Sequence, residues 1–244
     1  MSLQGRVVLL TRSAAAGPLE AELTSLGARV VARPTIAFAP PRDPRPMQAA
    51  VHNAYDWIAV TSAQGARSLV GLRTRAVRLA AVGEGTARAL RALDLHPVVV
   101  GAGNATSLAV SLLRVAQPGE RVLVVRPEEA RDALQETLSA AGLRVDAVAF
   151  YRTVAAPDVS DTARRVAEGE FDAVVFSSPS TFLRLREAGR GVTGFAAALT
   201  ASRRVAIGEV TAFALEQAGL PATAVAERPT DEAVVEALLR AFSR

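Results

Sequence analysis

Short apolar runs alternate with segments of helical periodicity along the whole chain. The apolar run at 6–10 is followed by apolar residues at helical spacing over 17–27, and the same order returns at 56–69 and 78–90. Strands separated by helices of about 10–15 residues are typical of βαβ units, whose parallel strands are covered by helices on both faces. The pattern therefore predicts an α/β fold.

The second half of the chain repeats this pattern. The segment AVGEGTARAL at 81–90 and the segment AIGEVTAFAL at 206–215 are identical at seven of ten positions. YDWIAVTSAQGARSL at 55–69 is similarly matched by FDAVVFSSPSTFLRL at 171–185, and five elements keep the same order at offsets of 115 to 125 residues. Such a period is too long for a solenoid. We interpret it as an internal duplication, which predicts two similar α/β units.

Two segments interrupt the alternation of strands and helices. Residues 34–46 include five prolines and are not expected to form a helix, and residues 148–158 form an extended run that includes a proline. Both are interpreted as crossings between the units. Two crossings suit a domain whose chain leaves and later returns.

The composition excludes several kinds of chemistry. Half of the residues are hydrophobic and 21% are charged, which is typical of a folded globular protein. The chain has no cysteine and no lysine, so it lacks thiolate ligands, lysine Schiff bases and the P-loop lysine. No apolar run is long enough to cross a membrane, and no signal segment is evident at the start, so we expect a cytoplasmic protein without a membrane partner.

The charges and the two histidines narrow the possible ligands further. The net charge is +4, the arginines are scattered among acidic residues, and aromatic residues are few. We therefore expect no nucleic-acid partner, whereas a small or mid-sized anion remains a plausible ligand. His52 and His96 have no neighbours at ligand spacing, so no metal site is expected. The segment GEGTAR at 83–88 begins like the glycine fingerprint of dinucleotide-binding proteins, but Arg88 stands in place of the third glycine. A dinucleotide-binding site is therefore not expected.

Small polar residues and arginines follow several predicted strands. Ligands of parallel sheets collect at the carboxyl ends of the strands, where helix N-termini favour anions. These candidate binding residues are Thr11, Arg12, Thr61, Ser62, Gly83 and Thr86, with Arg126, Ser178, Ser180, Gly208 and Thr211 in the second half. Thr86 and Thr211 could instead be helix N-caps, each contributing roughly 1 kcal/mol. Two matched sets favour a site in which both units hold one polyanion.

Tyr151 is the other candidate. It is one of two tyrosines and lies on a predicted crossing beside Arg152. It could be a half-buried structural aromatic. It could also donate a proton, although a phenol with a pKa near ~10 is a weak acid at neutral pH.

An ordered set of motifs resembles the uroporphyrinogen-III synthase family over essentially the whole chain. They are LLTR near the start, D-x-I-x-x-TS at 56–62, VGEGTARAL at 82–90, VAFYRT at 148–153, FDAVVFSSPS at 171–180, IGEVTAFAL at 207–215 and A-E-x-P-T at 226–230. The resemblance implies two flavodoxin-like parallel-sheet domains with helices on both faces, joined by a two-stranded crossover ladder. It places one domain at 1–36 plus 155–244 and the other at 37–154, with crossovers near 34–41 and 148–157.

The resemblance also implies an activity. Family members are cyclising hydro-lyases of tetrapyrrole biosynthesis that convert hydroxymethylbilane to uroporphyrinogen III, with loss of water and inversion of ring D. No cofactor is implied, and hydroxymethylbilane synthase is the implied upstream partner of a monomeric enzyme. Tyr151 would assist departure of the hydroxyl, and Thr86, Ser180 and Thr211 match positions that line the cleft. A non-catalytic bilobed sensor of a tetrapyrrole or small anion remains the alternative.

Overall fold

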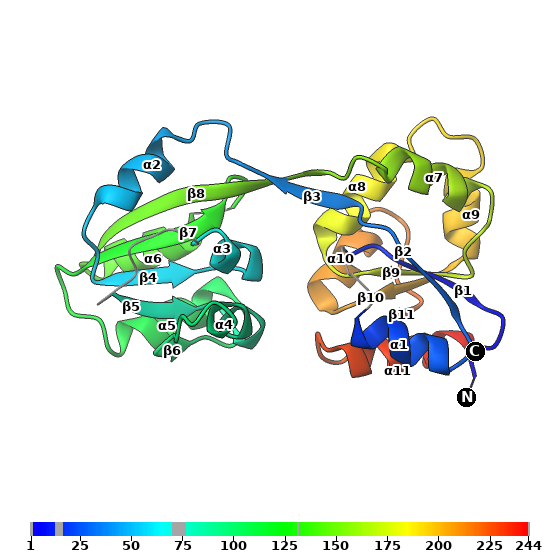
Figure 1. Cartoon of the computed structure of the whole chain (residues 1–244), viewed down its shortest axis with the longest axis horizontal. Helices are drawn as coiled ribbons and strands as arrows, with labels where there is room; N and C mark the ends of the chain where they lie inside the picture. Colours follow the sequence, from blue (N-terminus) through cyan, green and yellow to red (C-terminus); the bar gives the residue numbers. More distant parts are fainter. Residues whose placement is uncertain (1, 13–16, 70–76, 131, 244) are drawn as a thin grey trace. The chain divides into compact units, whose positions relative to one another are not determined.

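The chain forms two compact units. The computed structural model describes residues 2–12, 17–69, 77–130 and 132–243. Unit 1 comprises Met1–Ala37 and Val154–Arg244, and unit 2 comprises Phe38–Thr153 (Figure 1). The first boundary was expected one residue earlier and the second one residue later. Among the described residues, no helix combines the length and apolar character needed to cross a bilayer.

Unit 1 is a parallel sheet with helices on both faces. Its strands lie in the order β2 (Arg29–Ala32), β1 (Val7–Leu10), β9 (Ala173–Phe176), β10 (Arg203–Ala206) and β11 (Ala224–Val225). Its helices are α1 (Pro18–Ser25), α7 (Val159–Ala167), α8 (Pro179–Ala188), α9 (Phe195–Ala201), α10 (Glu209–Glu216) and α11 (Asp231–Phe242). Because side chains alternate along a strand, Leu10 packs with residues of α1 and α11, whereas Leu9 packs with the helices of the opposite face.

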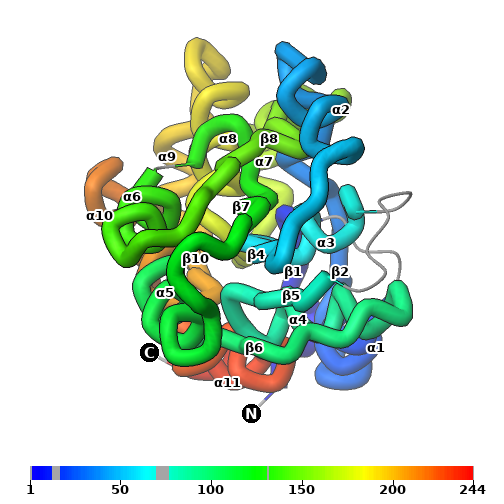
Figure 2. Tube along the Cα trace, turned by 90° about the vertical axis from the view of Figure 1, so that its left-hand side faces the viewer, coloured from blue at the N-terminus to red at the C-terminus, as the bar shows by residue number. Residues whose placement is uncertain are grey.

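Unit 2 is built in the same way. Its sheet has the order β3 (Ile36–Ala39), β8 (Arg144–Ala155), β7 (Arg121–Pro127), β4 (Trp57–Val60), β5 (Arg78–Ala81) and β6 (Val99–Val100). Its helices are α2 (Arg45–His52), α3 (Ala63–Arg67), α4 (Glu84–Arg91), α5 (Ala105–Leu113) and α6 (Ala133–Ala140). Helices α3 and α4 cover one face of this sheet, and α5 and α6 cover the other (Figure 2). The neighbouring strands β3 and β8 are the two elements that cross the boundary between the units.

The strand orders of the two sheets correspond. The order β2-β1-β9-β10-β11 of unit 1 is flavodoxin-like, and unit 2 has β8-β7-β4-β5-β6 with β3 added at the edge. Segments that are similar in sequence occupy corresponding places, since β7 takes the place of β1 and β4 takes the place of β9. The predicted α/β class, with two parallel sheets covered on both faces, is confirmed.

The proline-rich segment differs partly from its prediction. Residues 34–46 were expected to contain no helix, yet α2 begins at Arg45 and has Pro46 in its first turn. Proline is tolerated there because its missing N–H would have no partner within the helix. The prediction was therefore wrong for the last two residues of the segment.

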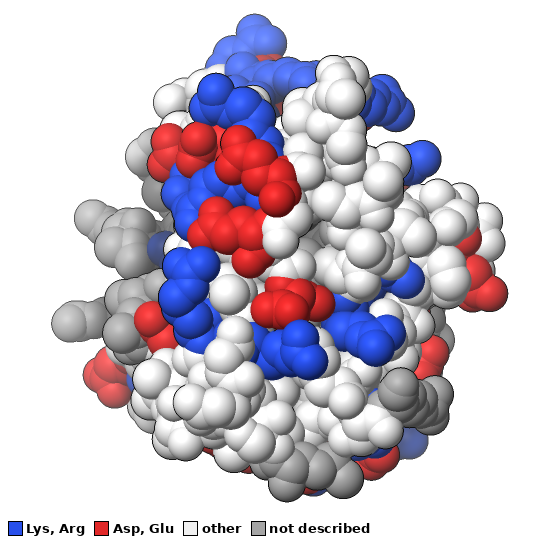
Figure 3. Space-filling model, turned by 90° about the vertical axis from the view of Figure 1, so that its right-hand side faces the viewer, with Lys and Arg blue, Asp and Glu red and all other residues white. Residues whose placement is uncertain are grey.

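Many arginines of unit 1 are held in local ion pairs. Arg165 forms two hydrogen bonds of 2.5 Å with Glu170, which also pairs with Arg29 at 3.1 Å. Arg33 pairs with Asp161 at 2.6 Å. Acidic and basic side chains accordingly lie beside one another on the face drawn in Figure 3. Such exposed pairs contribute roughly 0–1 kcal/mol each, so most of the stability comes from the apolar layers described above.

Candidate functional site

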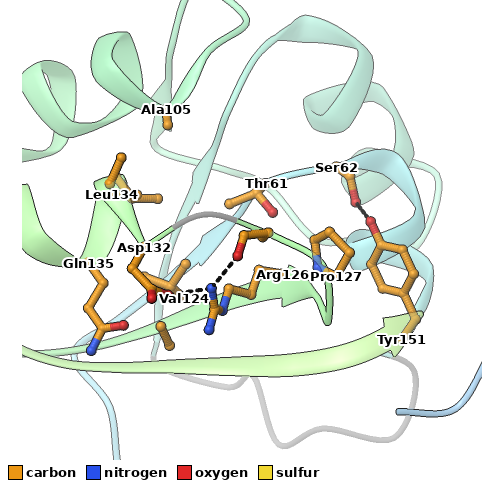
Figure 4. Close-up of a pocket in the computed structure, with 13 residues that line it drawn as sticks. Thr61, Ser62, Ala105, Val124, Arg126, Pro127, Asp132, Leu134, Gln135 and Tyr151 are labelled. Atoms are coloured by element: carbon orange, nitrogen blue, oxygen red, sulfur yellow. Dashed lines mark hydrogen bonds and ion pairs between the residues drawn. The ribbon is translucent and has the colours of Figure 1, made fainter. Parts of the chain in front are cut away.

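A cavity of about 410 Å³ opens in unit 2 where the chain direction changes across the sheet. Strands β4 and β7 are neighbours, but the helix after β4 packs on one face and the helix after β7 packs on the other. This is a topological switch point, where parallel sheets bind their ligands. The lining residues include Thr61, Ser62, Val124, Arg126, Pro127, Asp132, Leu134, Gln135 and Tyr151 (Figure 4).

Arg126 provides the cation of this cavity. It follows the buried part of β7, and its Nη1 donates to the Ala130 carbonyl at 3.0 Å and to Asp132 Oδ1 at 2.6 Å. Its Nε is buried and has no hydrogen-bond partner within the described part of the chain. Buried donors are normally satisfied, and a guanidinium forms its strongest hydrogen bonds with carboxylate or phosphate. The cavity therefore suits an anionic group.

Ser62 and Tyr151 meet at one end of the cavity (Figure 4). Their hydroxyl oxygens are 2.7 Å apart, and the Gly65 N–H donates to Ser62 Oγ at 2.8 Å. Ser62 is placed there because it is the N-cap of α3, and Tyr151 is held on β8 by an edge-to-face contact with Phe38. The ring of Tyr151 is buried, with only 6% of the residue exposed.

The environment of Tyr151 keeps its hydroxyl protonated. Burial raises the pKa of Tyr151 above 10.0, the hydrogen bond with Ser62 lowers it, and the negative charge of Glu129 raises it. The net direction is upward, so at neutral pH the group is a phenol. It can donate a proton but cannot act as a standing base.

Thr61 and its counterpart Thr11 have a structural role at corresponding strand ends. Thr61 Oγ1 donates to the Val125 carbonyl at 2.9 Å, and Thr11 Oγ1 donates to the Val175 carbonyl at 2.8 Å. Each side chain thus continues the pairing of two neighbouring strands past their ends. Thr11 is fully buried, whereas Thr61 lines the cavity and retains a free lone pair as acceptor.

Thr86 and Thr211 are not N-caps, so that alternative from the sequence analysis is wrong. The N-caps of α4 and α10 are Gly83 and Gly208, and each threonine lies two residues inside its helix and is buried. A glycine N-cap leaves the first N–H groups of the helix without a side-chain partner. Those N–H groups, rather than the threonine hydroxyls, are the free donors at these two helix starts.

The two N-cap glycines occupy different surroundings. A Cβ atom on Gly83 would lie 2.9 Å from Gly103 Cα, so glycine is required there for close packing of two backbone segments. A Cβ atom on Gly208 would meet no atom within 4 Å. Packing therefore explains the glycine in unit 2 but not the glycine in unit 1.

The remaining predicted residues lie at the carboxyl ends of strands in unit 1. Arg12 forms a two-pronged ion pair with Asp231 at 2.9 and 3.2 Å, and its Nε is buried without a partner in the described ranges, as in Arg126. Ser178 caps α8, with its Oγ accepting from Thr181 N–H at 3.2 Å. Ser180 is half-buried in the first turn of the same helix.

The structure adds site features that were not predicted. Asp132 pairs with Arg126 and lines the cavity together with Leu134 and Gln135. An acidic residue six positions after an arginine at a strand end is the only sequence signal for that pair. The contact between Ser62 and Tyr151 joins residues 89 positions apart, and no local pattern indicates it. Within the described residues, no three His, Asp or Glu side chains are grouped closely enough to hold a metal ion.

Comparisons with known proteins bear on what this site does. The family model described as uroporphyrinogen-III synthase HemD matches residues 17–236 of the chain. A crystal structure of a mutant uroporphyrinogen III synthase from Thermus thermophilus is similar with a TM-score of 0.66 and 24% identity, covering 98% of this chain and 99% of that one. A uroporphyrinogen-III synthetase from Helicobacter pylori is similar with a TM-score of 0.63 and 15% identity, covering 96% and 98%. At these identities the structures show a shared fold.

Proposed function

Because this chain belongs to the uroporphyrinogen-III synthase family, we propose that it closes hydroxymethylbilane to uroporphyrinogen III, with loss of water and inversion of ring D. The observation that carries the proposal is the family match over residues 17–236. The chemistry of the unit 2 cavity supports it, since a cation and a buried phenol lie at the switch point of a parallel sheet.

The residues of the cavity suit the first step of the reaction. The lone pair of the pyrrole nitrogen expels the terminal hydroxyl, the C–O bond breaks, and the leaving oxygen takes the Tyr151 proton and departs as water. The azafulvenium ion that remains is attacked by the substituted carbon of ring D, giving a spirocyclic intermediate. The older bond from that carbon to its bridging methylene then breaks, and the methylene forms a new bond to the unsubstituted α carbon of ring D, which inverts the ring. The proton lost when the product regains its aromatic ring restores the phenol, so overall one water leaves.

Binding and orientation account for most of the catalysis in this proposal. The substrate bears eight carboxylates, and Arg126 would receive one of them beside the Ser62 and Tyr151 pair. Holding the reacting carbons in a near-attack arrangement can replace much acid–base machinery. The cavity holds one weak acid, Tyr151, and one cation, Arg126, which is paired with Asp132, and this limited machinery is consistent with catalysis of this kind.

We propose that unit 1 also contacts the substrate, through residues that correspond to those of unit 2. Arg12 retains a buried donor without a partner among the residues described, and Gly208 leaves open space at the N-terminus of α10. Free N–H groups at a helix start stabilise carboxylates. Ser178 and Ser180 lie at the N-terminus of α8, Thr211 is buried in the first turn of α10, and Thr11 is buried at the end of β1. The contacts of these four residues with substrate stay predictions.

Alanine substitutions at the two N-cap glycines are expected to have opposite consequences. Gly83→Ala should destabilise the protein by about 1–3 kcal/mol, because the new methyl group would overlap the backbone at Gly103. Gly208→Ala should leave thermal stability unchanged or slightly higher, because its surroundings are open, and should raise KM for the substrate. Thermal denaturation and initial-rate kinetics measure both. An unchanged KM in Gly208→Ala would remove the α10 N-terminus from the proposed binding surface.

The decisive test of the function is the isomer that forms. Supplied with hydroxymethylbilane, the chain should give uroporphyrinogen III, whereas spontaneous closure gives the symmetric type I isomer. Chromatographic separation of the oxidised porphyrins measures the ratio. Only type I product, formed at the spontaneous rate, would overturn the proposal. If the tetrapyrrole then still bound without turnover, the non-catalytic sensor would be favoured.

Further parts of the proposal concern the setting of the reaction. We propose that the chain acts as a monomer in the cytoplasm without a cofactor, and that hydroxymethylbilane synthase supplies its substrate. The corresponding strand orders of the two sheets support an origin by internal duplication. Size measurement in solution, with and without the upstream enzyme, tests the monomer and the partner.

A further inference from the structure

Two corresponding helix caps have different partners in the two units. Ser62 caps α3 and Ser178 caps α8, and they occupy matching positions of the sequence repeat. In unit 1, Thr181 closes a capping box, with its Oγ1 accepting from the Ser178 N–H at 3.3 Å. In unit 2 the third helical residue is Gly65, which has no side chain to return that bond. The hydroxyl of Ser62 instead meets Tyr151 at 2.7 Å.

The tyrosine itself has no counterpart in the repeat. Aligning 138–151 with 23–36 places Ile36 at the position of Tyr151. The serine is therefore present in both halves of the chain, whereas the hydrogen bond between that serine and a tyrosine belongs to unit 2. Helix capping alone explains Ser178 but does not explain why Ser62 also contacts the proton donor of the proposed reaction.

The hydrogen bonds around Ser62 define a direction. Ser62 Oγ accepts from the Gly65 N–H at 2.8 Å, so its own hydrogen is free to point at the Tyr151 oxygen, 2.7 Å away. If Ser62 is the donor, the hydrogen of Tyr151 is released from this contact and can be directed into the cavity that both residues line. Hydrogen bonds aligned in this way, from Gly65 to Ser62 to Tyr151, strengthen one another.

We propose that Ser62 is a positioning residue that donates a hydrogen bond to the Tyr151 oxygen. This bond directs the phenol proton to the substrate and stabilises the phenolate that forms when the proton is transferred. The inference rests on the proposed function for its substrate but makes a claim about Tyr151 that can be measured without substrate. The charged groups near Tyr151 are Glu129, whose charge opposes phenolate, and Arg126 with its partner Asp132, which line the same cavity. None of them is altered by the substitutions used below.

The first test is a spectroscopic titration of the tyrosine. The chain has two tyrosines, so in a Tyr55→Phe background the tyrosinate absorbance at about 295 nm reports Tyr151 alone. Ser62→Ala should raise its titration midpoint by about half a pH unit or more, because one hydrogen bond to the phenolate is lost. Ser62→Thr, which keeps the hydroxyl and the cap, should leave the midpoint near its original value. Circular dichroism at each pH confirms that the protein remains folded, and an unchanged midpoint in Ser62→Ala would overturn the proposal.

The second test measures the coupling between the two residues. Ser62→Ala should lower kcat about 5- to 10-fold with little change in KM, and should cause no further loss in a Tyr151→Phe background. If the two substitutions lowered kcat independently, so that the loss in the double variant equalled the product of the two single losses, the proposal would be overturned even if the wild-type chain makes uroporphyrinogen III. Asn104→Ala removes the N-cap of α5 in the same unit and controls for lost helix capping. It should match Ser62→Ala in lost stability but retain kcat.

Discussion

Replacing Tyr151 by phenylalanine is expected to lower kcat by about 10²-fold and to leave the protein folded. The hydroxyl would no longer protonate the leaving oxygen, whereas the ring would keep its edge-to-face contact with Phe38. This loss of kcat is at the lower end of the range usual for removal of a general acid, because the pyrrole nitrogen itself helps to expel the hydroxyl. Ser62 would keep its bond from Gly65, so the expected cost in stability is about 1 kcal/mol. Initial rates of uroporphyrinogen III formation and thermal denaturation measure the two effects.

Tyr55 provides a matched control for that substitution. Its hydroxyl also forms a hydrogen bond with a side chain, here by donating to Asp146 at 2.8 Å, but Tyr55 does not line the cavity at the switch point. Tyr55→Phe should therefore cost a similar amount of stability and leave kcat unchanged. A loss beyond ~10⁴-fold in Tyr151→Phe would show that acid catalysis outweighs orientation. An unchanged kcat would remove Tyr151 from the reaction.

Replacing Arg126 by glutamine is expected to raise KM by about 10- to 100-fold with a smaller effect on kcat. The guanidinium would bind a substrate carboxylate before and during the reaction, and a charge-assisted hydrogen bond is worth about 1.5–3 kcal/mol. This contact would be equally strong in the bound substrate and in the transition state. Its loss would therefore raise KM and change kcat little. Initial rates over a range of hydroxymethylbilane concentrations, at fixed ionic strength, separate the two constants.

Arg121 is the matched control, because it lies on the same strand at the opposite end. It pairs with Asp146 at 3.1 Å, far along β7 from the carboxyl end where Arg126 lies. Arg121→Gln removes the same charge from the chain and should leave KM unchanged. Equal increases in both variants would indicate general attraction of an anionic substrate to a positive protein rather than a specific contact.

The fold was predictable because its signals are local and repeated. Four buried apolar residues between turns, as in β4 and β9, indicate a strand in a covered parallel sheet. Helix α2 was missed because prolines precede it, although a proline in the first turn is compatible with a helix. Helix α9 has seven residues and follows an N-cap glycine, Gly194, with positive φ, so it is a short element with little periodicity to detect.

The candidate site was predictable only as a location. Parallel strands bring their carboxyl ends to one edge of a sheet, so strand ends were the right places to look. Sequence order alone assigned Thr61 and Ser62 to one half and Arg126 to the other, and the grouping of all three in unit 2 followed only from the domain bounds that the family resemblance implies. The side chains that contact these residues could not be predicted, because they lie on elements that only tertiary packing brings close to them. Tyr151 lies opposite Pro127, the last residue of β7, after an irregularity in the register between Arg126 and Pro127, and from there its hydroxyl meets Ser62. No period or motif in the sequence encodes that irregularity.

The way the chain passes through unit 2 before it returns to unit 1 has a consequence for synthesis on the ribosome. Strand β1 pairs with β9, so Val8 cannot form its pairing with Ala173 until that residue has been synthesised. Strands β10 and β11 of the same sheet are synthesised later still. Unit 2 lies entirely within Phe38–Thr153 and can fold as soon as it emerges, whereas the amino-terminal strands remain exposed on one side until the last third is made. Chains truncated near residue 160 and released from the ribosome should therefore protect unit 2 from protease and leave β1 and β2 open to cleavage or to binding by chaperones.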